Sequence, residues 1–335
     1  MAVTLELEVQ SLPLAAPFRI SGYVFESSDA VVVTLRDGIH CGRGEAAGVY
    51  YTGDDSSRMV TQIGGVRVAV EAGANRSDLR QLLPPGGARN ALDCAMWELE
   101  ASRAEKPVWE LAGIDRPRPL RTTFTLGADT PSAMAEGALR YADARSIKIK
   151  LTGELDLDIA RVRAIREARP DAWLGVDGNQ GFKKEELLAL TSALEAYGVS
   201  LLEQPLARGC EIDLQGFASP IPIAADESIL SLAELDRAPG RFDVINIKLD
   251  KCGGLTEGLM IAAEARRLGL GVMVGNMVGT SLAMAPAFVL GQLCDLVDLD
   301  GPTFLARDRS PSVEYRNGDI SAGPEVWGAP ASALA

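Results

Sequence analysis

Histidine is almost absent from this sequence: His40 is the only one in 335 residues. It lies in the run Asp37–Gly42, which is typical of a turn between two strands. A Ser-His-Asp triad or a metal site built from several histidines would have to use this one residue, so the sequence argues against both. Acid–base chemistry must therefore depend mainly on Lys, Asp, Glu, Tyr or Cys side chains.

Cysteine is scarce and follows no pairing pattern. The cysteines are odd in number and include no Cys-x-x-Cys pair: Cys41, Cys94, Cys210, Cys252 and Cys294. A disulfide framework or a zinc–thiolate site is not expected, and a reducing compartment fits better. Glu6 and Glu8 stand in an alternating apolar pattern near the amino terminus, which indicates a strand and not a signal peptide. We expect a cytoplasmic protein.

Positive charge is in deficit, because 33 Lys and Arg stand against 46 Asp and Glu, a formal net charge of −13. Nucleic acid is not an expected partner, since binding it needs clustered positive charge. The uncharged run Leu268–Cys294 imitates a membrane span, but Gly275, Asn276 and Pro286 interrupt it. The pattern indicates a buried strand, a loop and a buried helix, and no membrane partner.

The length and the 47% of hydrophobic residues suggest two domains, or one barrel with an addition. The first part of the chain predicts strands at 2–10, 30–35 and 42–47, followed by helices, the last of them at 90–111. A proline-rich seam, Arg116–Pro119, marks a boundary. We expect an α+β domain over 1–115.

Beyond the seam, apolar β-rich runs alternate with helical segments. The expected strands are Thr122–Leu126, Ser146–Lys150, Trp173–Asp177, Ser200–Glu203, Ile223–Asp226, Val244–Lys248, Gly271–Gly275 and Leu296–Asp300. This order predicts a (β/α)₈ barrel over 116–305, in which one helix could be shortened, and a segment 306–335 that returns to the amino-terminal domain. An open doubly wound sheet is disfavoured, because Asp129 and Thr130 stand where it would carry a glycine-rich turn; Thr130-Pro131 instead predicts a helix start.

Carboxylates end three consecutive strands: Asp177, Glu203 and Asp226. Catalytic residues of such barrels lie at these carboxyl ends, and buried charges are costly unless paired or bound to a metal. Three converging carboxylates suit Mg²⁺ with open positions for substrate and water. The alternative is that each one caps a helix or forms a salt bridge.

Lysines end the strands on both sides of these carboxylates, with Lys150 on strand two and Lys248 on strand six. A substrate carboxylate bound to Mg²⁺ would place its α-carbon between two amines. One lysine could then remove the α-proton while the other returns one to the opposite face, through a metal-stabilised enediolate. The pKa of a free lysine is too high for it to act as a base at neutral pH. Lys148, two residues before Lys150, and the metal ion would lower the pKa of the catalytic lysine toward neutrality. The alternative is a pair of solvated surface lysines.

Together these motifs resemble the enolase superfamily, in its muconate-lactonising-enzyme subgroup. The segment Gly42–Glu45 is similar to a turn of that subgroup's capping domain, and the strand ends supply the rest. The resemblance implies one Mg²⁺ per subunit on Asp177, Glu203 and Asp226, an acid/base pair of Lys150 and Lys248, and a homo-oligomer. Asn179 and Glu227 are expected to support the metal ligands. The mandelate-racemase branch uses a histidine on strand seven, which this chain lacks.

The pair Asp298 and Asp300 resembles the Asp-x-Asp motif with which dipeptide epimerases hold the α-ammonium group of the substrate, although the two could also be helix caps. Epimerases of Ala-Glu meet the glutamate side chain with an arginine in the capping domain, where this chain offers Tyr23, with Arg19 four residues earlier. Asn276 is a further expected substrate residue. The sequence leaves open whether Ala-Glu or a less acidic dipeptide is used.

The leading hypothesis is therefore a Mg²⁺-dependent dipeptide epimerase. The enzyme alternatives are an N-acylamino-acid racemase, an o-succinylbenzoate synthase or a cycloisomerase with the same metal and lysines. A silent barrel that serves as a binding or scaffold protein is the alternative of another class. Asp298 and Asp300 distinguish the enzymes, because a neutral N-acyl group does not need two carboxylates.

Overall fold

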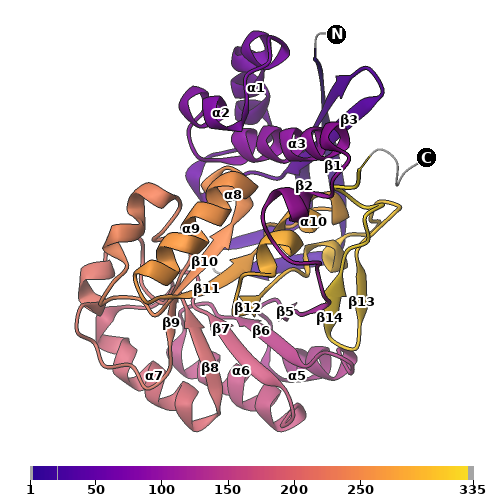
Figure 1. Cartoon of the computed structure of the whole chain (residues 1–335). Coiled ribbons are helices and arrows are strands. Elements are labelled where there is room, and N and C mark those ends of the chain that lie inside the picture. Colours follow the sequence, from indigo (N-terminus) through magenta and orange to yellow (C-terminus); the bar gives the residue numbers. More distant parts are fainter. Residues whose placement is uncertain (1–2, 21, 331–335) are drawn as a thin grey trace.

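The structure of the protein, a computed structural model, describes residues 3–20 and 22–330. Figure 1 shows a lower body of parallel strands surrounded by helices and an upper body in which helices lie beside an antiparallel sheet. We call the lower body the barrel and the upper one, β1–β3 with α1–α4, the amino-terminal domain. The functional site lies where these two bodies meet.

The barrel contains eight parallel strands in which each strand pairs with the next along the chain. They are β5 (Phe124–Leu126), β6 (Ser146–Lys150), β7 (Trp173–Asp177), β8 (Val199–Glu203), β9 (Ile223–Ala225), β10 (Val244–Lys248), β11 (Gly271–Gly275) and β12 (Leu296–Val297). The first strand meets the last where the backbone N–H of Thr123 donates to the carbonyl of Val297 at 3.0 Å. The predicted (β/α)₈ barrel is confirmed.

The helices of the barrel are less regular than its strands. Full helices are α5 (Pro131–Arg140), α6 (Leu155–Ala168), α7 (Leu187–Ala196), α9 (Leu255–Arg267) and α10 (Ser281–Gly291), and α8 (Leu249–Cys252) is one turn. Short 3₁₀ turns replace helices after three strands: Glu211–Leu214, Leu232–Arg237 and Gly301–Phe304. The sequence pattern allowed for one shortened helix, and the described barrel has such replacements after three strands. After β8 the reason is plain, since Pro205, Gly209 and Gly216 interrupt the segment.

Two local predictions for the barrel are confirmed. Helix α5 begins at Pro131, and the hydroxyl of Thr130 accepts a hydrogen bond from the backbone N–H of Ala133. The uncharged run forms β11, a loop and α10. Among the described helices, none combines the length and the apolar composition that crossing a bilayer requires.

The sheet of the amino-terminal domain has the order β1 (Thr4–Ile20), β2 (Tyr23–Asp37), β3 (His40–Ala46). The first two strands are much longer than predicted. Their register shifts between Pro13 and Phe18, after which Phe18 pairs with Phe25. This extension is largely exposed and lacks the apolar alternation of a strand with one buried face, so the sequence pattern did not reveal it.

The helices of this domain are α1 (Ser56–Glu71), α2 (Arg76–Leu82), α3 (Gly87–Ala104) and α4 (Val108–Leu111). The predicted single helix 90–111 is in fact α3 and α4. Glu105 ends α3 with a left-handed backbone (φ 52°), and Pro107 then restarts the chain as the cap of α4. Proline lacks the N–H that a continuous helix needs, and it disfavours helical geometry at the residue before it.

The strand predicted over 42–47 is confirmed as β3, and the segment Gly42–Glu45, which the family resemblance suggested as a turn, lies within it. A Cβ atom added at Gly44 would lie 2.0 Å from the carbonyl oxygen of Ala91, and one at Gly42 would lie 2.1 Å from that of Ala95. The glycines therefore let the backbone of α3 rest directly on the strand.

Replacing Gly44 with alanine is expected to lower the free energy of unfolding by about 3 kcal/mol, because rigid backbone on both sides leaves no room for the methyl group. Urea unfolding followed by circular dichroism measures the loss. Gly64→Ala is the control, since a Cβ atom there meets nothing within 4 Å. Equal stability of the two variants would contradict the close approach.

The carboxyl-terminal segment contacts both bodies. Strands β13 (Glu314–Arg316) and β14 (Asp319–Ser321) form a small sheet with β4 (Leu120–Arg121) beside the barrel. Farther on, the indole N–H of Trp327 donates to the carbonyl of Arg43, and the backbone N–H of Gly328 donates to Glu98.

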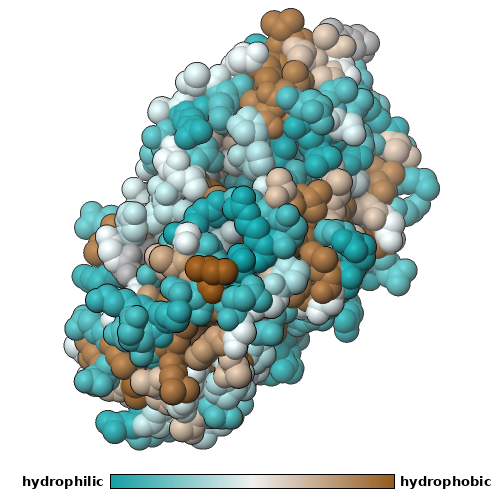
Figure 2. All heavy atoms as spheres, turned by 90° about the vertical axis from the view of Figure 1, so that its left-hand side faces the viewer, coloured by the Kyte–Doolittle hydropathy of each residue, from teal (hydrophilic) through white to brown (hydrophobic). Residues whose placement is uncertain are grey.

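The face drawn in Figure 2 mixes brown hydrophobic groups of a few residues with teal hydrophilic ones.

Candidate active site

Strand register places the predicted functional residues side by side. Lys150 pairs with Asp177 between β6 and β7, and Asp177 pairs with Glu203 between β7 and β8. Asp226 directly follows β9. Because parallel strands end at the same rim, these side chains converge at the carboxyl end of the barrel.

The three carboxylates form a compact buried cluster. One oxygen from each of Asp177, Glu203 and Asp226 lies within 4.8 Å of the others, and the residues are at most 1% exposed. Burial, with Asp177 nearby, raises the pKa of Glu203 to about 7. Burial also acts to raise the pKa of Asp226, but Lys248 and Lys251 outweigh it and hold this pKa well below its usual range.

The two predicted acid/base lysines contact different members of this cluster. The Nζ atom of Lys150 lies 2.7 Å from Asp177, and that of Lys248 lies 2.6 Å from Asp226. Burial acts to lower the pKa of Lys248, yet Asp226 outweighs it, so the pKa is raised. Positive charge placed among the carboxylates would act in the opposite direction and make an amine a better base.

Lys148 lies deeper in the barrel than Lys150, two residues earlier on the same strand. Its Nζ atom is 2.7 Å from Glu203 and 2.8 Å from Asp298. Burial acts to lower the pKa of Lys148, but the carboxylates, Asp298 first among them, raise it well above its usual value. The side chain is therefore held as a cation within the cluster.

The cluster fits a hard divalent cation. Its donors are all oxygen atoms, as Mg²⁺ prefers. Two more oxygens, Oε2 of Glu227 and Oδ1 of Asn179, are buried with no hydrogen-bonding partner in the described part of the chain. Burial raises the pKa of Glu227 to about 8, with Asp226 adding to the effect. Excess carboxylate and unpaired oxygen in one place favour a bound cation.

The backbone at this rim is strained. Among the described residues, five that are not glycine have positive φ angles, and three of them are Asn179, Gln180 and Gln204. They directly follow the strands that carry Asp177 and Glu203. Such conformations cost free energy and tend to occur at functional sites, where the surrounding structure maintains them.

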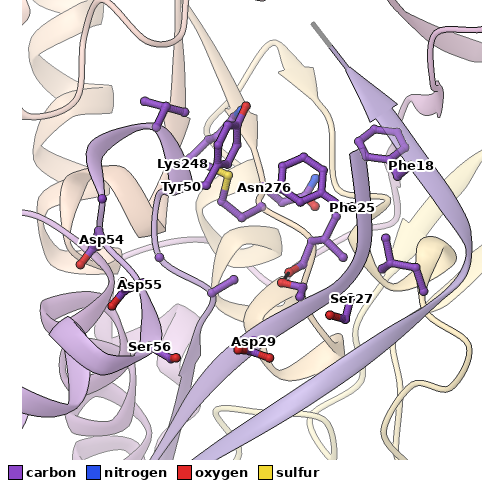
Figure 3. Close-up of a pocket in the computed structure, with 18 of the residues that line it drawn as sticks. Phe18, Phe25, Ser27, Asp29, Tyr50, Asp54, Asp55, Ser56, Lys248 and Asn276 are labelled. Carbon is purple, nitrogen blue, oxygen red and sulfur yellow. Dashed lines mark hydrogen bonds between the residues drawn. The ribbon is translucent and has the colours of Figure 1, made fainter. Parts of the chain in front are cut away.

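A cavity of about 390 Å³ lies above the cluster, between the barrel and the amino-terminal domain. Figure 3 shows Lys248 and Asn276 on its barrel side and Phe18, Phe25 and Tyr50 on the other. Lys150, Asn179, Asp226 and Glu227 complete the barrel side. A small molecule in this cavity would therefore contact both the lysines and the carboxylate cluster.

Other predicted substrate residues lie off the cavity wall. Tyr23 stacks on Phe25 with ring centroids 5.9 Å apart, so it supports a lining residue, and Arg19 is an exposed neighbour of Phe18. Asp298 and Asp300 are buried at the end of β12. His40 bonds to Ser102 inside the amino-terminal domain, as expected for a residue without a role in the site.

Asp298 and Asp300 already have partners within the barrel. Asp298 accepts hydrogen bonds from Lys148 and Thr123, and Asp300 accepts one of 2.6 Å from the backbone N–H of Thr125. Burial and the charge of Asp298 raise the pKa of Asp300 to about 7. Whether they meet an α-ammonium group stays a prediction.

Two buried residues of the cluster were missed from sequence. The Nζ atom of Lys251 lies 2.6 Å from the Asp226 carboxylate, and the amide of Asn246 donates to Glu203 at 2.8 Å. Asn246 is inside the strand that ends at Lys248, two residues earlier, so alternation along the strand could have identified it. No sequence pattern identifies Lys251, because the direction of its side chain depends on the single helical turn α8.

Asp250 connects the two bodies at the edge of the cavity. Its Oδ1 atom accepts hydrogen bonds from the backbone N–H groups of Ala47 and Gly48, which line the cavity. Burial raises the pKa of Asp250 to about 7. A carboxyl with a higher pKa in the folded state takes up protons on folding, so its contribution to stability falls as pH rises from about 4 to 7.

Asp250→Asn is expected to keep both hydrogen bonds, because the amide retains an acceptor oxygen, and to remove this component of the pH dependence. Asp250→Ala should lose the bonds and about 2 kcal/mol of unfolding free energy. Urea unfolding of the three proteins between pH 4 and pH 8 measures both effects. A parallel pH profile for wild type and Asp250→Asn would contradict the role of the buried carboxyl.

Comparisons with known proteins agree with this geometry. Residues 2–113 match the family "Mandelate racemase / muconate lactonizing enzyme, N-terminal domain", and residues 133–324 match "Enolase C-terminal domain-like". The L-Ala-D/L-Glu epimerase of Escherichia coli K12 is 39% identical over 319 residues, which cover 95% of this chain and 99% of that protein. An N-acetyl-D-glutamate racemase of Pseudoalteromonas sp. is 43% identical over 253 residues, 75% of this chain and 79% of that protein.

A solved structure is similar over nearly the whole chain. It is an enolase family member from Agrobacterium tumefaciens with homology to dipeptide epimerases, with bound sodium and L-Ala-L-Glu. Its TM-score is 0.93 at 38% sequence identity, and the match covers 97% of this chain and 100% of that one. The chain therefore belongs to the mandelate racemase/muconate lactonizing enzyme family of the enolase superfamily.

Proposed function

We propose that this protein is a dipeptide epimerase that inverts the α-carbon of the carboxyl-terminal residue of its substrate. The observation that carries the proposal is the placement of Lys150 and Lys248, which contact different carboxylates of one buried cluster and line the same cavity. Inversion by proton transfer needs one group to take a proton from one face and another to supply one from the opposite face. The names of the relatives support the same reaction class.

Asp177, Glu203 and Asp226 would hold one Mg²⁺ ion, as the all-oxygen donor set favours. A divalent cation there would draw electron density from the substrate carboxylate and so acidify the α-proton. Lys150 and Lys248 then exchange protons with the α-carbon, one from each side. Lys148, held as a cation between Glu203 and Asp298, places positive charge two residues before Lys150 on the same strand.

The α-ammonium group of a dipeptide would be met by Asp300, supported by Asp298.

An N-acylamino-acid racemase is the second candidate, and one observation favours it. Both oxygens of Asp298 are already engaged by Lys148 and Thr123, which leaves Asp300 as the carboxylate for a substrate cation. A neutral N-acyl group needs no such partner.

Proton exchange in D₂O tests the proposal. The protein with Mg²⁺ is incubated with a set of L,L-dipeptides and a matched set of N-acetyl-L-amino acids, and α-deuterium is followed by NMR. We expect deuterium at the α-carbon of the carboxyl-terminal residue of dipeptides and its loss when EDTA is present. Exchange in the N-acetyl set alone would replace the proposed function with the second candidate.

A further inference from the structure

The outer wall of the cavity is aromatic and acidic. Figure 3 shows Phe25, Ser27 and Asp29 following one strand of the amino-terminal domain, with Asp54, Asp55 and Ser56 across the opening. Side chains two residues apart share one face of a strand, which groups Phe25, Ser27 and Asp29; Ser28 also lines the cavity and donates to the carbonyl of Val278, whereas Glu26 does not line it. This part of the wall therefore follows strand β2 from Phe25 to Asp29, and the chain that leads into α1 supplies the acids opposite it.

Aromatic rings form the part of the wall next to the lysines. The ring of Tyr50 lies edge-on to that of Phe25, with centroids 5.2 Å apart, and Tyr51 lies 5.0 Å from Tyr50. All three line the cavity. Such rings bind the methylene stem of a long side chain and attract a cation over their faces.

No cationic side chain is part of this outer wall in the described chain. Among the described residues that line the cavity, the only cations are Lys150 and Lys248, and both are paired with carboxylates of the cluster. Arg19 directly follows the lining residue Phe18 on its strand and so faces the other side, while Arg58 lines a neighbouring cavity that shares Asp54, from where its charge acts on Asp54 and Asp55. The wall therefore offers hydroxyl groups but no cationic side chain to an acidic side chain of a substrate.

The acids of this wall have free capacity for a cation. Asp29 is exposed and forms no ion pair in the described part of the chain. Asp55 caps helix α1, and the hydrogen bond from the Arg58 backbone N–H, with one from Ser57, holds its pKa below the usual value, so it stays ionised. At the inner end of the cavity, the unpartnered Oε2 of Glu227, in a residue 2% exposed, belongs with the carboxylate cluster and is an acceptor distinct from those of the wall.

We propose that the residue inverted by this protein carries a basic side chain, lysine or arginine. Its stem packs on Phe25 and Tyr50, and its head group binds Asp29 and Asp55. This inference rests on the proposed function, because it needs the substrate carboxylate at the buried cluster and the side chain directed toward the amino-terminal domain. It predicts a substrate different from those of the two relatives named for glutamate compounds.

The test compares substrates that differ only in side-chain charge. The kcat/KM for α-proton exchange in D₂O is measured for L-Ala-L-Lys, for L-Ala-L-norleucine as its neutral analogue, and for L-Ala-L-Glu. We expect L-Ala-L-Lys to exceed norleucine by about tenfold, as a charge-assisted hydrogen bond implies, and to exceed L-Ala-L-Glu by more. A higher value for L-Ala-L-Glu, or equal values for lysine and norleucine, overturns the inference while the proposed function stands.

Variants locate the preference on the wall. The double variant D29N/D55N is expected to reduce the ratio of lysine to norleucine to about one, and asparagine also caps helices well, so α1 is retained. E26Q removes one charge from the same strand on its other face and should keep the ratio. If D29N/D55N keeps the wild-type ratio of kcat/KM between the lysine and norleucine substrates, the assignment of the preference to Asp29 and Asp55 is overturned.

The same series is run with N-acetyl-lysine, N-acetyl-norleucine and N-acetyl-glutamate. Because the inverted residue keeps its carboxylate and side chain, the wall meets it in the same way in both series. If only the N-acetyl compounds exchange protons, the proposed dipeptide activity fails and the charge preference is decided in that series. If neither series exchanges, both proposals are overturned.

Discussion

Lys248→Met is expected to reduce kcat for inversion by about a thousandfold, and Lys150→Met by a similar factor. Methionine retains the length of the side chain but cannot bind or release a proton. The buried amine of Lys248 lies 2.6 Å from Asp226, inside the cavity that would hold the α-carbon. Inversion needs both lysines, so either loss stops it.

Exchange without inversion separates the two roles. In D₂O, one variant should still exchange the α-proton of the L substrate and the other that of the D substrate, because each keeps the base for one face. Polarimetry measures inversion, and NMR measures exchange. Lys184→Met is the control, since Lys184 is exposed and pairs with Asp213 at the surface. Two variants that both invert normally would remove the two-base assignment.

Asp226→Asn is expected to have the largest effect on stability, a loss of about 3–5 kcal/mol in metal-free buffer. The Asp226 carboxylate pairs with both Lys248 and Lys251 at 2.6 Å, and these lysines are 6% and 4% exposed. A neutral amide leaves two buried ammonium groups without their nearest counter-charge. The same change removes a proposed metal ligand, so activity at a given Mg²⁺ concentration should fall at least about a hundredfold.

Urea unfolding in EDTA measures the stability loss, and a Mg²⁺ titration of activity measures the loss of affinity. Asp213→Asn is the matched control, because Asp213 also pairs with a lysine at 2.8 Å but at the surface. It should cost at most about 1 kcal/mol. If the two variants lose equal stability, the buried ion pairs of Asp226 do not contribute more to the free energy of unfolding than the surface pair does.

Much of the barrel could be predicted from sequence because each of its strands is a short apolar run buried on both sides. The charged residues that end these runs, such as Asp177 and Glu203, stand out against them. Parallel pairing in chain order then brings the ends to one rim, and the register of Lys150, Asp177 and Glu203 shows this directly. Here local pattern and global topology agree.

The amino-terminal domain was less predictable. The outer halves of β1 and β2 are exposed on both sides, so no apolar alternation marks them. Whether Phe25 or Tyr23 reaches the cavity depends on the register of this hairpin and its packing over the barrel. Lys251 and Asp250 likewise acquire partners more than twenty residues away, and sequence spacing does not determine such contacts.

The sequence by itself determined the barrel, the position of three carboxylates and two lysines at its rim, and the absence of histidine chemistry. These follow from short-range patterns: the period of buried strands and the cost of burying charge at their ends. Only the tertiary structure decided what faces the substrate from the other side. That wall joins residues of β2 to the loop that leads into α1, and its charge depends on which side chains a hairpin register directs inward.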